Sequence, residues 1–299
     1  MVERTHVLNI VSHLIMITGL VLATLPIYVV FIASTHDAIT VNRVPLPLWP
    51  GGHLLENYHN AWERAEFGRA FINSLIVAAG VTVGKISLAA LSAFSIVYFN
   101  YRLRMLFFWI IFASLMLPLE VRIVPTYAVV SNVLQPFQML LSFGGLQFGL
   151  PEINLLNTYA GLVFPLVATA TGTFLYRQFF LTVPDELAES AMLDGAGALR
   201  FFFDILLPLS RTNIAALATI MFVYAWNQYL WPLLIVTDPA KSTATMQLQK
   251  VLPDPLALIG QIPMWNEAMA ATLLVMIPPL IVVIFMQGYF VRGLMAAEK

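Results

Sequence analysis

The sequence predicts an all-α integral membrane protein with six transmembrane helices. Of its 299 residues, 60% are hydrophobic and 10% are charged, and the mean hydropathy is +0.82. This composition is too apolar for a soluble domain of that length. Apolar runs of roughly twenty residues, the length that crosses a bilayer as a helix, recur along the chain. Because their number is even, we expect both termini on the same side of the membrane.

The six apolar runs set the predicted spans in order. They cover residues 7–33, 71–97, 105–124, 159–180, 213–236 and 268–291. The first run is longer than the hydrophobic core of a signal peptide, which is roughly 7 to 15 residues, so we interpret it as an uncleaved helix. Residues 133–150 are also apolar, but proline, glycine and glutamine interrupt them. We expect surface or re-entrant helices there and no crossing.

Prolines flank two charged residues at the end of the third predicted span. Pro118 and Pro125 lie on either side of Glu120 and Arg122, and prolines inside a helix remove hydrogen bonds and clash with the preceding turn. We therefore expect irregular backbone there. Such backbone is tolerated at membrane depth only where it is buried in protein or lines a cavity. This end of the span is a candidate outer gate.

Lys85 lies near the centre of the second predicted span. A charged group at that depth costs several kcal/mol unless it is paired or solvated, so we expect it to face other helices, either in a structural contact or on a substrate path. Gly84 and Lys85 do not form a phosphate-binding loop, because Ala79 replaces the required first glycine and Ile86 replaces the Ser or Thr. We find no nucleotide-binding loop in the chain, so any ATP must be bound by another subunit.

Other classes of function receive no support from the composition. The absence of cysteine excludes disulfides, thiolate metal sites and a cysteine nucleophile. A net charge of −1 with scattered basic residues gives no indication of nucleic-acid binding. No acid/base, nucleophilic or metal-ligand cluster indicates an enzyme. We therefore predict no catalytic residues and no metal site.

The longest polar stretch, residues 182–211, lies between two predicted spans. Thr182, Pro184 and Asp185 predict a helix start with a capping hydroxyl, and Gly195 predicts its end. A second short helix is expected over residues 198–206, ended by Pro208. In isolation, such a helix pair is typical of an amphipathic hairpin on the membrane surface.

The spacing inside this stretch is more specific than amphipathicity alone. Glu189, Ala191, Gly195, Ile205, Leu207 and Pro208 stand in the order and separations of the EAA loop of ABC-importer permeases, which the chain resembles. The resemblance extends over nearly the whole chain. The segments that carry it most clearly are residues 117–127, 201–220, 224–235 and 290–294, which are similar to glycerol 3-phosphate permeases of the maltose-type group.

This resemblance implies a MetI-like ABC-importer permease fold with a cytoplasmic coupling loop at residues 182–211. The residues expected to couple to the ATPase are Glu189, Ala191, Asp194, Gly195, Ala196, Ile205 and Pro208. The implied partners are a second, distinct permease, two ATP-binding-cassette subunits and a periplasmic or extracellular solute-binding protein. ATP and Mg would then be bound by the ATPase and not by this chain.

The resemblance also implies a substrate, glycerol 3-phosphate or a related glycerophosphodiester. A dehydrated phosphate needs donors or positive charge, so the candidate pathway residues are Lys85, Glu120 and Arg122, with Asn227 and Gln228 for the glycerol hydroxyls. The two amides could instead form hydrogen bonds between helices. Alternative functions are a sugar or oligosaccharide ABC permease, an ion-coupled secondary transporter and a membrane enzyme acting on a phosphorylated glycerol compound.

The distribution of basic residues predicts the orientation. With both termini in the cytoplasm of a bacterial cell, the cytoplasmic segments hold eight Lys and Arg residues and the outer segments hold six, spread over much longer loops. Basic residues concentrate in short cytoplasmic loops of membrane proteins. We therefore expect a multi-pass inner-membrane protein with cytoplasmic termini and a cytoplasmic coupling loop.

Overall fold

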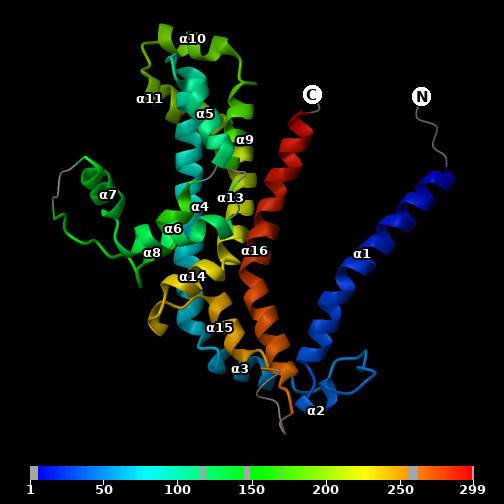
Figure 1. Ribbon diagram of the computed structural model, residues 1–299. Helices are drawn as coiled ribbons and strands as arrows, with labels where there is room; N and C mark the ends of the chain where they lie inside the picture. Colours follow the sequence, from blue (N-terminus) through cyan, green and yellow to red (C-terminus); the bar gives the residue numbers. More distant parts are fainter. Residues whose placement is uncertain are drawn as a thin grey trace. The chain divides into compact units, whose positions relative to one another are not determined.

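The computed structural model describes residues 6–114, 117, 119–144, 149–168, 170–254 and 262–297. The described residues form helices and no strand (Figure 1). They divide into two units. One comprises residues 1–68 and 247–277, and the other comprises residues 69–246 and 278–299.

In the first unit, polar side chains join the end of one long helix, a short helix and the start of another long helix. These helices are α1 (His6–Ser34), α3 (Leu54–Arg64) and the beginning of α16 (Trp265–Ala297), and the unit also contains α2 (Ala38–Val41). The Asn57 amide of α3 donates to the carbonyls of Ser34 and His36, at 2.9 and 2.7 Å. Arg64 pairs with the largely buried Glu267 at 2.9 Å.

The second unit contains most of the remaining helices. They are α4 (Phe67–Tyr98), α5 (Arg104–Ala113), α6 (Leu119–Ser131), α7 (Gln135–Phe143), α8 (Tyr159–Val167), α9 (Ala170–Phe180), α10 (Asp185–Leu193), α11 (Ala198–Arg200), η2 (Phe201–Leu206), α12 (Leu207–Leu209), α13 (Arg211–Trp226), α14 (Leu230–Ile235), η3 (Pro239–Lys241) and α15 (Ala244–Val251). Three helices cross the boundaries between the units. Helix α4 begins two residues before the boundary at residue 69, α15 continues past the boundary at residue 247, and α16 contains the boundary at residue 278.

Two glycines one turn apart allow α4 to approach α8 closely. A Cβ added at Gly80 would lie 3.2 Å from a methyl group of Val163, and one added at Gly84 would lie 2.7 Å from a methyl group of Val167. Small residues four apart permit this packing between apolar helices. Gly84 therefore has a packing role, next to the buried Lys85.

The third predicted span is divided between two helices. Helix α5 ends at Ala113 and α6 begins at Leu119. Irregular backbone was expected to continue to Pro125, and this expectation is wrong, because α6 runs through Pro125 to Ser131. Proline removes one backbone donor, and α6 nevertheless continues for six residues beyond Pro125.

The last two elements before α15 are tied to the start of α8. Asn157, at φ 57°, accepts hydrogen bonds through Oδ1 from the backbone N–H groups of Thr237 and Asp238, at 2.7 and 2.9 Å. The Trp231 indole N–H donates to the Gly161 carbonyl at 3.2 Å. Residues 227–229 separate α13 from α14, so the predicted fifth span is also made of two helices.

Three helices of the described chain are long and apolar enough to cross a membrane individually: Leu8–Ser34, Phe67–Tyr98 and Trp265–Tyr289. Two bent pairs, α8 with α9 and the helix over 198–209 with α13, raise this number to five if each pair is one span. The individual boundaries of the six predicted spans stay a prediction.

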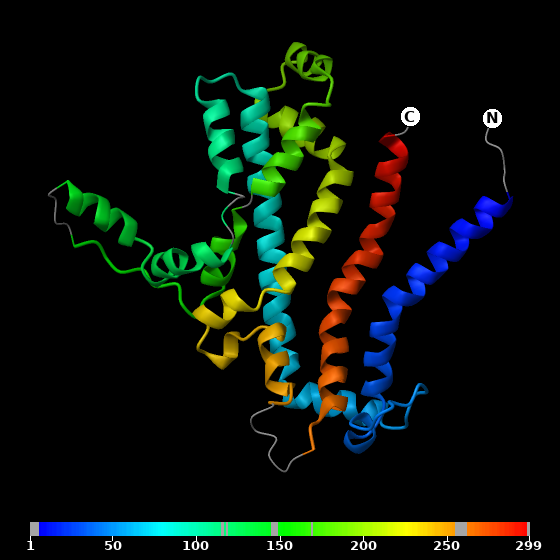
Figure 2. The ribbon, with the colours of Figure 1, turned by 45° about the vertical axis from the view of Figure 1, so that its right-hand side comes forward.

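The apolar segment 133–150 forms a surface helix over part of its length. Figures 1 and 2 both show α7 projecting from the other helices of the second unit. Its last residue, Phe143, is 94% exposed. Residues 145–148 lie outside the described residues, but the nine-residue α7 is too short to be a span.

Candidate functional site

The EAA-like stretch folds as a helix, a turn and a second helix. Its first helix, α10, begins at Asp185 with Pro184 as the residue before it. The predicted cap by Thr182 is wrong, because its hydroxyl donates at 2.7 Å to the carbonyl of Phe179 in the preceding helix. Asp185 and Glu186 occupy the first turn, where carboxylates stabilise the positive end of the helix dipole.

Gly195 ends α10 as predicted, in the left-handed conformation with φ +75°. Its N–H donates to the Met192 carbonyl at 3.0 Å, and the Ala196 N–H donates to the Ala191 carbonyl at 2.8 Å. This pair of bonds is a Schellman motif, which satisfies carbonyls that the helix end would leave unpaired. Gly195 therefore fixes the direction in which the chain leaves α10.

The second helix of the loop is longer than expected. The elements α11, η2 and α12 follow one another without interruption over residues 198–209, with a wide π-type turn in the middle. Pro208 was expected to end this helix before residue 208, whereas the helix continues one residue past the proline, to Leu209. The chain instead bends by 76° into α13 after Leu209.

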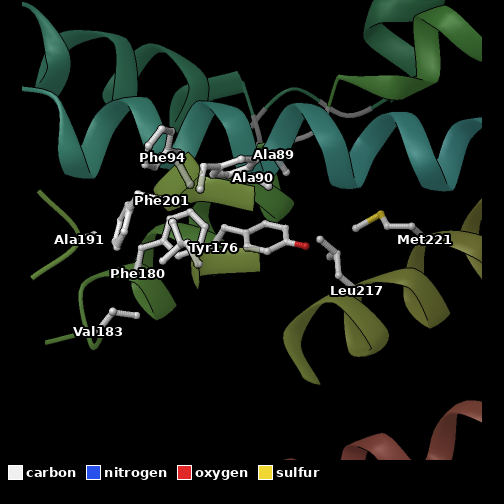
Figure 3. Close-up of a cluster of buried hydrophobic side chains, with 13 residues drawn as sticks. Ala89, Ala90, Phe94, Tyr176, Phe180, Val183, Ala191, Phe201, Leu217 and Met221 are labelled. Carbon is white, nitrogen blue, oxygen red and sulfur yellow. The ribbon is translucent and has the colours of Figure 1, made fainter. Parts of the chain in front are cut away.

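The second helix packs into a buried cluster that joins it to α4, α9 and α13. Figure 3 shows Phe201 near Phe94 of α4 and Phe180 of α9, with Tyr176 of α9 extending from this group toward Leu217 and Met221 of α13. The rings of Phe94 and Phe202 are centred 4.9 Å apart. Burial of large apolar side chains stabilises such contacts by about 1.5–3 kcal/mol each. Movement of this helix would therefore be transmitted to α4, α9 and α13.

The first helix of the loop has one buried side and a broad exposed side. Ala191 is 5% exposed and packs in the cluster, whereas Leu193 is 90% exposed. Glu189 and Asp194 are also exposed, and Ala196, Ile205 and Pro208 are partly buried. The predicted coupling residues are thus divided between an outward-facing surface and the contacts that hold it.

A cavity of about 590 Å³ lies within the same unit, between α4, α5, α6, α9 and α13. It brings together Lys85 and Arg122, which are far apart in the sequence. The other polar residues lining it are Ser92, Ser114, Thr171, Thr173 and Tyr224. The cavity therefore combines two cations with hydroxyl groups.

Lys85 and part of the Arg122 side chain are buried in the protein. Lys85 is 6% exposed, and its ammonium lies 4.4 Å from the centre of the Tyr224 ring. Such a cation–π contact stabilises a desolvated ammonium by about 2 kcal/mol. The Arg122 Nε is buried without a hydrogen-bond partner. No carboxylate forms an ion pair with either residue among the described side chains. The cavity thus suits an anion.

The two predicted amides, Asn227 and Gln228, are not among the residues that line this cavity. Asn227 is the exposed residue that ends α13. Gln228 accepts a hydrogen bond through its backbone carbonyl from the Thr245 hydroxyl at 2.8 Å, and its side chain donates weakly to the Tyr224 carbonyl at 3.4 Å. Glu120 belongs to α6, but its side chain lies outside the described residues.

Sequence reasoning did not single out Tyr224 or the four hydroxyl-bearing residues of the cavity. Isolated Ser and Thr residues are common in apolar spans, where they bond to their own helix. Tyr224 is close in sequence to the polar pair Asn227 and Gln228, and the predicted contacts with the substrate were assigned to these two amides instead. Only the crossing of α4 and α13 shows that Tyr224 meets Lys85.

Within the described part of the chain, long apolar helices, an exposed short helix packed on a buried cluster and a cationic cavity form an arrangement typical of a transport permease. Residues 85–295 match the family described as the binding-protein-dependent transport system inner membrane component. The chain belongs to this family of ABC-transporter permeases.

Relatives and solved structures agree with this assignment. The chain is 46% identical to the sn-glycerol-3-phosphate transport system permease protein UgpE of Yersinia pestis and 47% identical to that of Escherichia coli O157:H7, over the full length of each. It is similar in fold to a crystal structure of a bacterial ABC transporter involved in the import of the acidic polysaccharide alginate. That match has a TM-score of 0.74 and 19% identity, and it covers 97% of this chain and 99% of the other.

Proposed function

We propose that this permease carries glycerol 3-phosphate, or a closely related glycerophosphodiester, through the membrane in an ATP-driven importer. The observation that carries the proposal is the cavity with Lys85 and Arg122 and no carboxylate paired to them among the described side chains. Relatives of 46–47% identity over the full length bear the name of this transport system.

The chemistry of the cavity fits a phosphate ester. Phosphate oxygens accept strong hydrogen bonds from charged donors, and the Arg122 guanidinium can bind two of them at once. Lys85 would act as a point charge held over the Tyr224 ring. The hydroxyls of Ser92, Thr171 and Ser114 would meet the glycerol end. A volume of about 590 Å³ accommodates such a small anion with water.

The coupling loop supplies the link to ATP. We infer that two cytoplasmic ATPase subunits, which bind ATP and Mg, receive the exposed side of α10 in a groove, with Glu189 as a charged contact. A second permease would complete the pathway, and a periplasmic or extracellular binding protein would deliver the substrate. Closure of the ATPases would displace the loop, and the cluster around Phe201 would pass this displacement to α4, α9 and α13.

Uptake of labelled glycerol 3-phosphate tests the substrate. Cells that lack this permease but contain its partners would receive the wild-type chain, Arg122→Ala or Arg122→Lys at matched membrane abundance. Loss of a charged hydrogen bond costs about 1.5–3 kcal/mol, so we expect uptake at low substrate concentration to fall roughly tenfold to a hundredfold with Arg122→Ala. The Lys variant should retain part of the uptake.

The control is Arg69→Ala, which removes an exposed arginine that does not line the cavity. It should transport like the wild type. Full uptake by Arg122→Ala would keep the substrate but remove Arg122 from the pathway. Failure of the wild-type chain with its partners present would contradict the substrate and redirect attention to a sugar.

A further inference from the structure

A second, smaller cavity lies where the end of α4, the start of α5 and the end of α9 meet. Its volume is about 140 Å³, and its lining comprises Ile96, Val97, Arg104, Met105, Arg177 and Leu181. This volume equals that of about five water molecules, enough for a phosphate group. Two arginines therefore share a small space with four apolar side chains.

The guanidinium of Arg177 is held in position without a hydrogen-bond partner at its Nε. It stacks 4.4 Å above the centre of the Phe108 ring, and Nε is buried without a partner. No carboxylate forms an ion pair with Arg104 or Arg177 among the described side chains. A guanidinium stacked on a ring keeps its planar edge free to bind two oxygens of a phosphate.

The two arginines of this cavity differ in their surroundings from an arginine that extends into water. Arginines near helix ends ordinarily place their charge in the aqueous phase, as the exposed Arg102 on the same turn does. Arg104 and Arg177 are half-buried instead. At the cavity, Met105 is 43% exposed and Leu181 is 54% exposed, so apolar side chains beside the two cations face the surroundings.

We propose that this cavity binds the phosphate group of an anionic phospholipid, with Arg104 and Arg177 as its donors and the exposed apolar residues against its acyl chains. Basic pockets between membrane helices recognise such headgroups. Free inorganic phosphate offers the same oxygens but no acyl chain to cover Met105 and Leu181. The apolar lining therefore favours the lipid.

The site lies beside the residues that hold the coupling loop. Val97 lines the cavity and also packs against the buried cluster of Phe94 and Phe201. Figures 1 and 2 show the start of α5 and the helix α10 at the same end of the second unit. With the coupling loop in the cytoplasm, as proposed above, the lipid belongs to the cytoplasmic leaflet. The binding itself does not depend on which substrate is carried.

Lipid selectivity of the assembled importer tests the proposal. The complex would be reconstituted in phosphatidylcholine with a trace of spin-labelled phosphatidylglycerol or spin-labelled phosphatidylcholine, and the motionally restricted fraction of each would be measured. We expect the wild type to restrict more phosphatidylglycerol than phosphatidylcholine. The variant with Arg104→Gln and Arg177→Gln should restrict both to the same extent.

Matched variants separate a specific site from general charge. Arg102→Gln removes one positive charge from the same turn and should leave the preference intact, and Arg177→Lys should keep part of it. Co-purification with the partner subunits would verify assembly, and the single variant Arg177→Gln serves if the double variant does not assemble. An equal loss with Arg102→Gln would overturn the proposal. Binding of radiolabelled inorganic phosphate that needs both arginines, without any lipid preference, would overturn the lipid in favour of free phosphate.

Discussion

Gly195 occupies a backbone conformation that only glycine adopts without strain. Its φ of +75° is required by the Schellman turn that ends α10, and a β-branched side chain there costs about 1–3 kcal/mol. We expect Gly195→Val to shift α10 relative to the second helix of the loop. Transport and its coupling to ATP hydrolysis should fall at least severalfold, measured as substrate-stimulated ATPase activity and uptake by the reconstituted complex.

Gly197→Val is the matched control for this prediction. Gly197 lies two residues further along the same turn at φ −73°, and an added Cβ meets nothing within 4 Å. This variant should retain coupling. Equal activity of the two variants in normally assembled complexes would show that the turn conformation at Gly195 is not required for coupling.

Among the helices, the crossing of α4 and α8 leaves no room for an added methyl group. A Cβ at Gly84 would lie 2.7 Å from a methyl group of Val167, and overpacking of this kind costs about 1–3 kcal/mol. We expect Gly84→Ala to lower the unfolding temperature of the complex and to reduce uptake, because Lys85 is the next residue on α4 and lines the cavity.

The repacked double variant tests whether the cost arises at this contact. Gly84→Ala combined with Val167→Ala restores the space, so its unfolding temperature should exceed that expected from the two single changes added together. Gly19→Ala in α1, where an added Cβ meets nothing within 4 Å, is the neutral control. Strict additivity of the two changes would contradict the proposed crossing.

The elements differ in how well their sequences predicted them. The helices α1, α4 and α16 follow from long, predominantly apolar runs, and the turn at Gly195 follows from the backbone conformation that glycine favours. The helix through Pro125 and the break at residues 227–229 depend on packing between helices, which a local pattern does not contain. The meeting of Lys85 with Arg122 and Tyr224 required the three-dimensional arrangement of α4, α6 and α13.

The path of the whole chain across the bilayer is the prediction with the widest consequences. It depends on the apolar segment 133–150 not crossing, because one extra span would place the coupling loop on the side opposite to residues 100–104. The chain contains no cysteine, so single cysteines can be introduced without background. Asn100, Leu193 and Leu55 suit this purpose because all three side chains are exposed.

We expect Asn100→Cys and Leu193→Cys to react with a membrane-impermeant maleimide only after the cytoplasmic side is opened, and Leu55→Cys to react in intact spheroplasts. Positions 100 and 193 lie on either side of segment 133–150 in the sequence. Equal accessibility of the two cysteines would therefore show that this segment does not cross the membrane. Opposite accessibility of Asn100→Cys and Leu193→Cys would show an extra crossing and remove the coupling loop from the reach of cytoplasmic ATPases. Protection of Leu193→Cys by the assembled ATPase, without protection of Asn100→Cys, would in addition place the partner on α10.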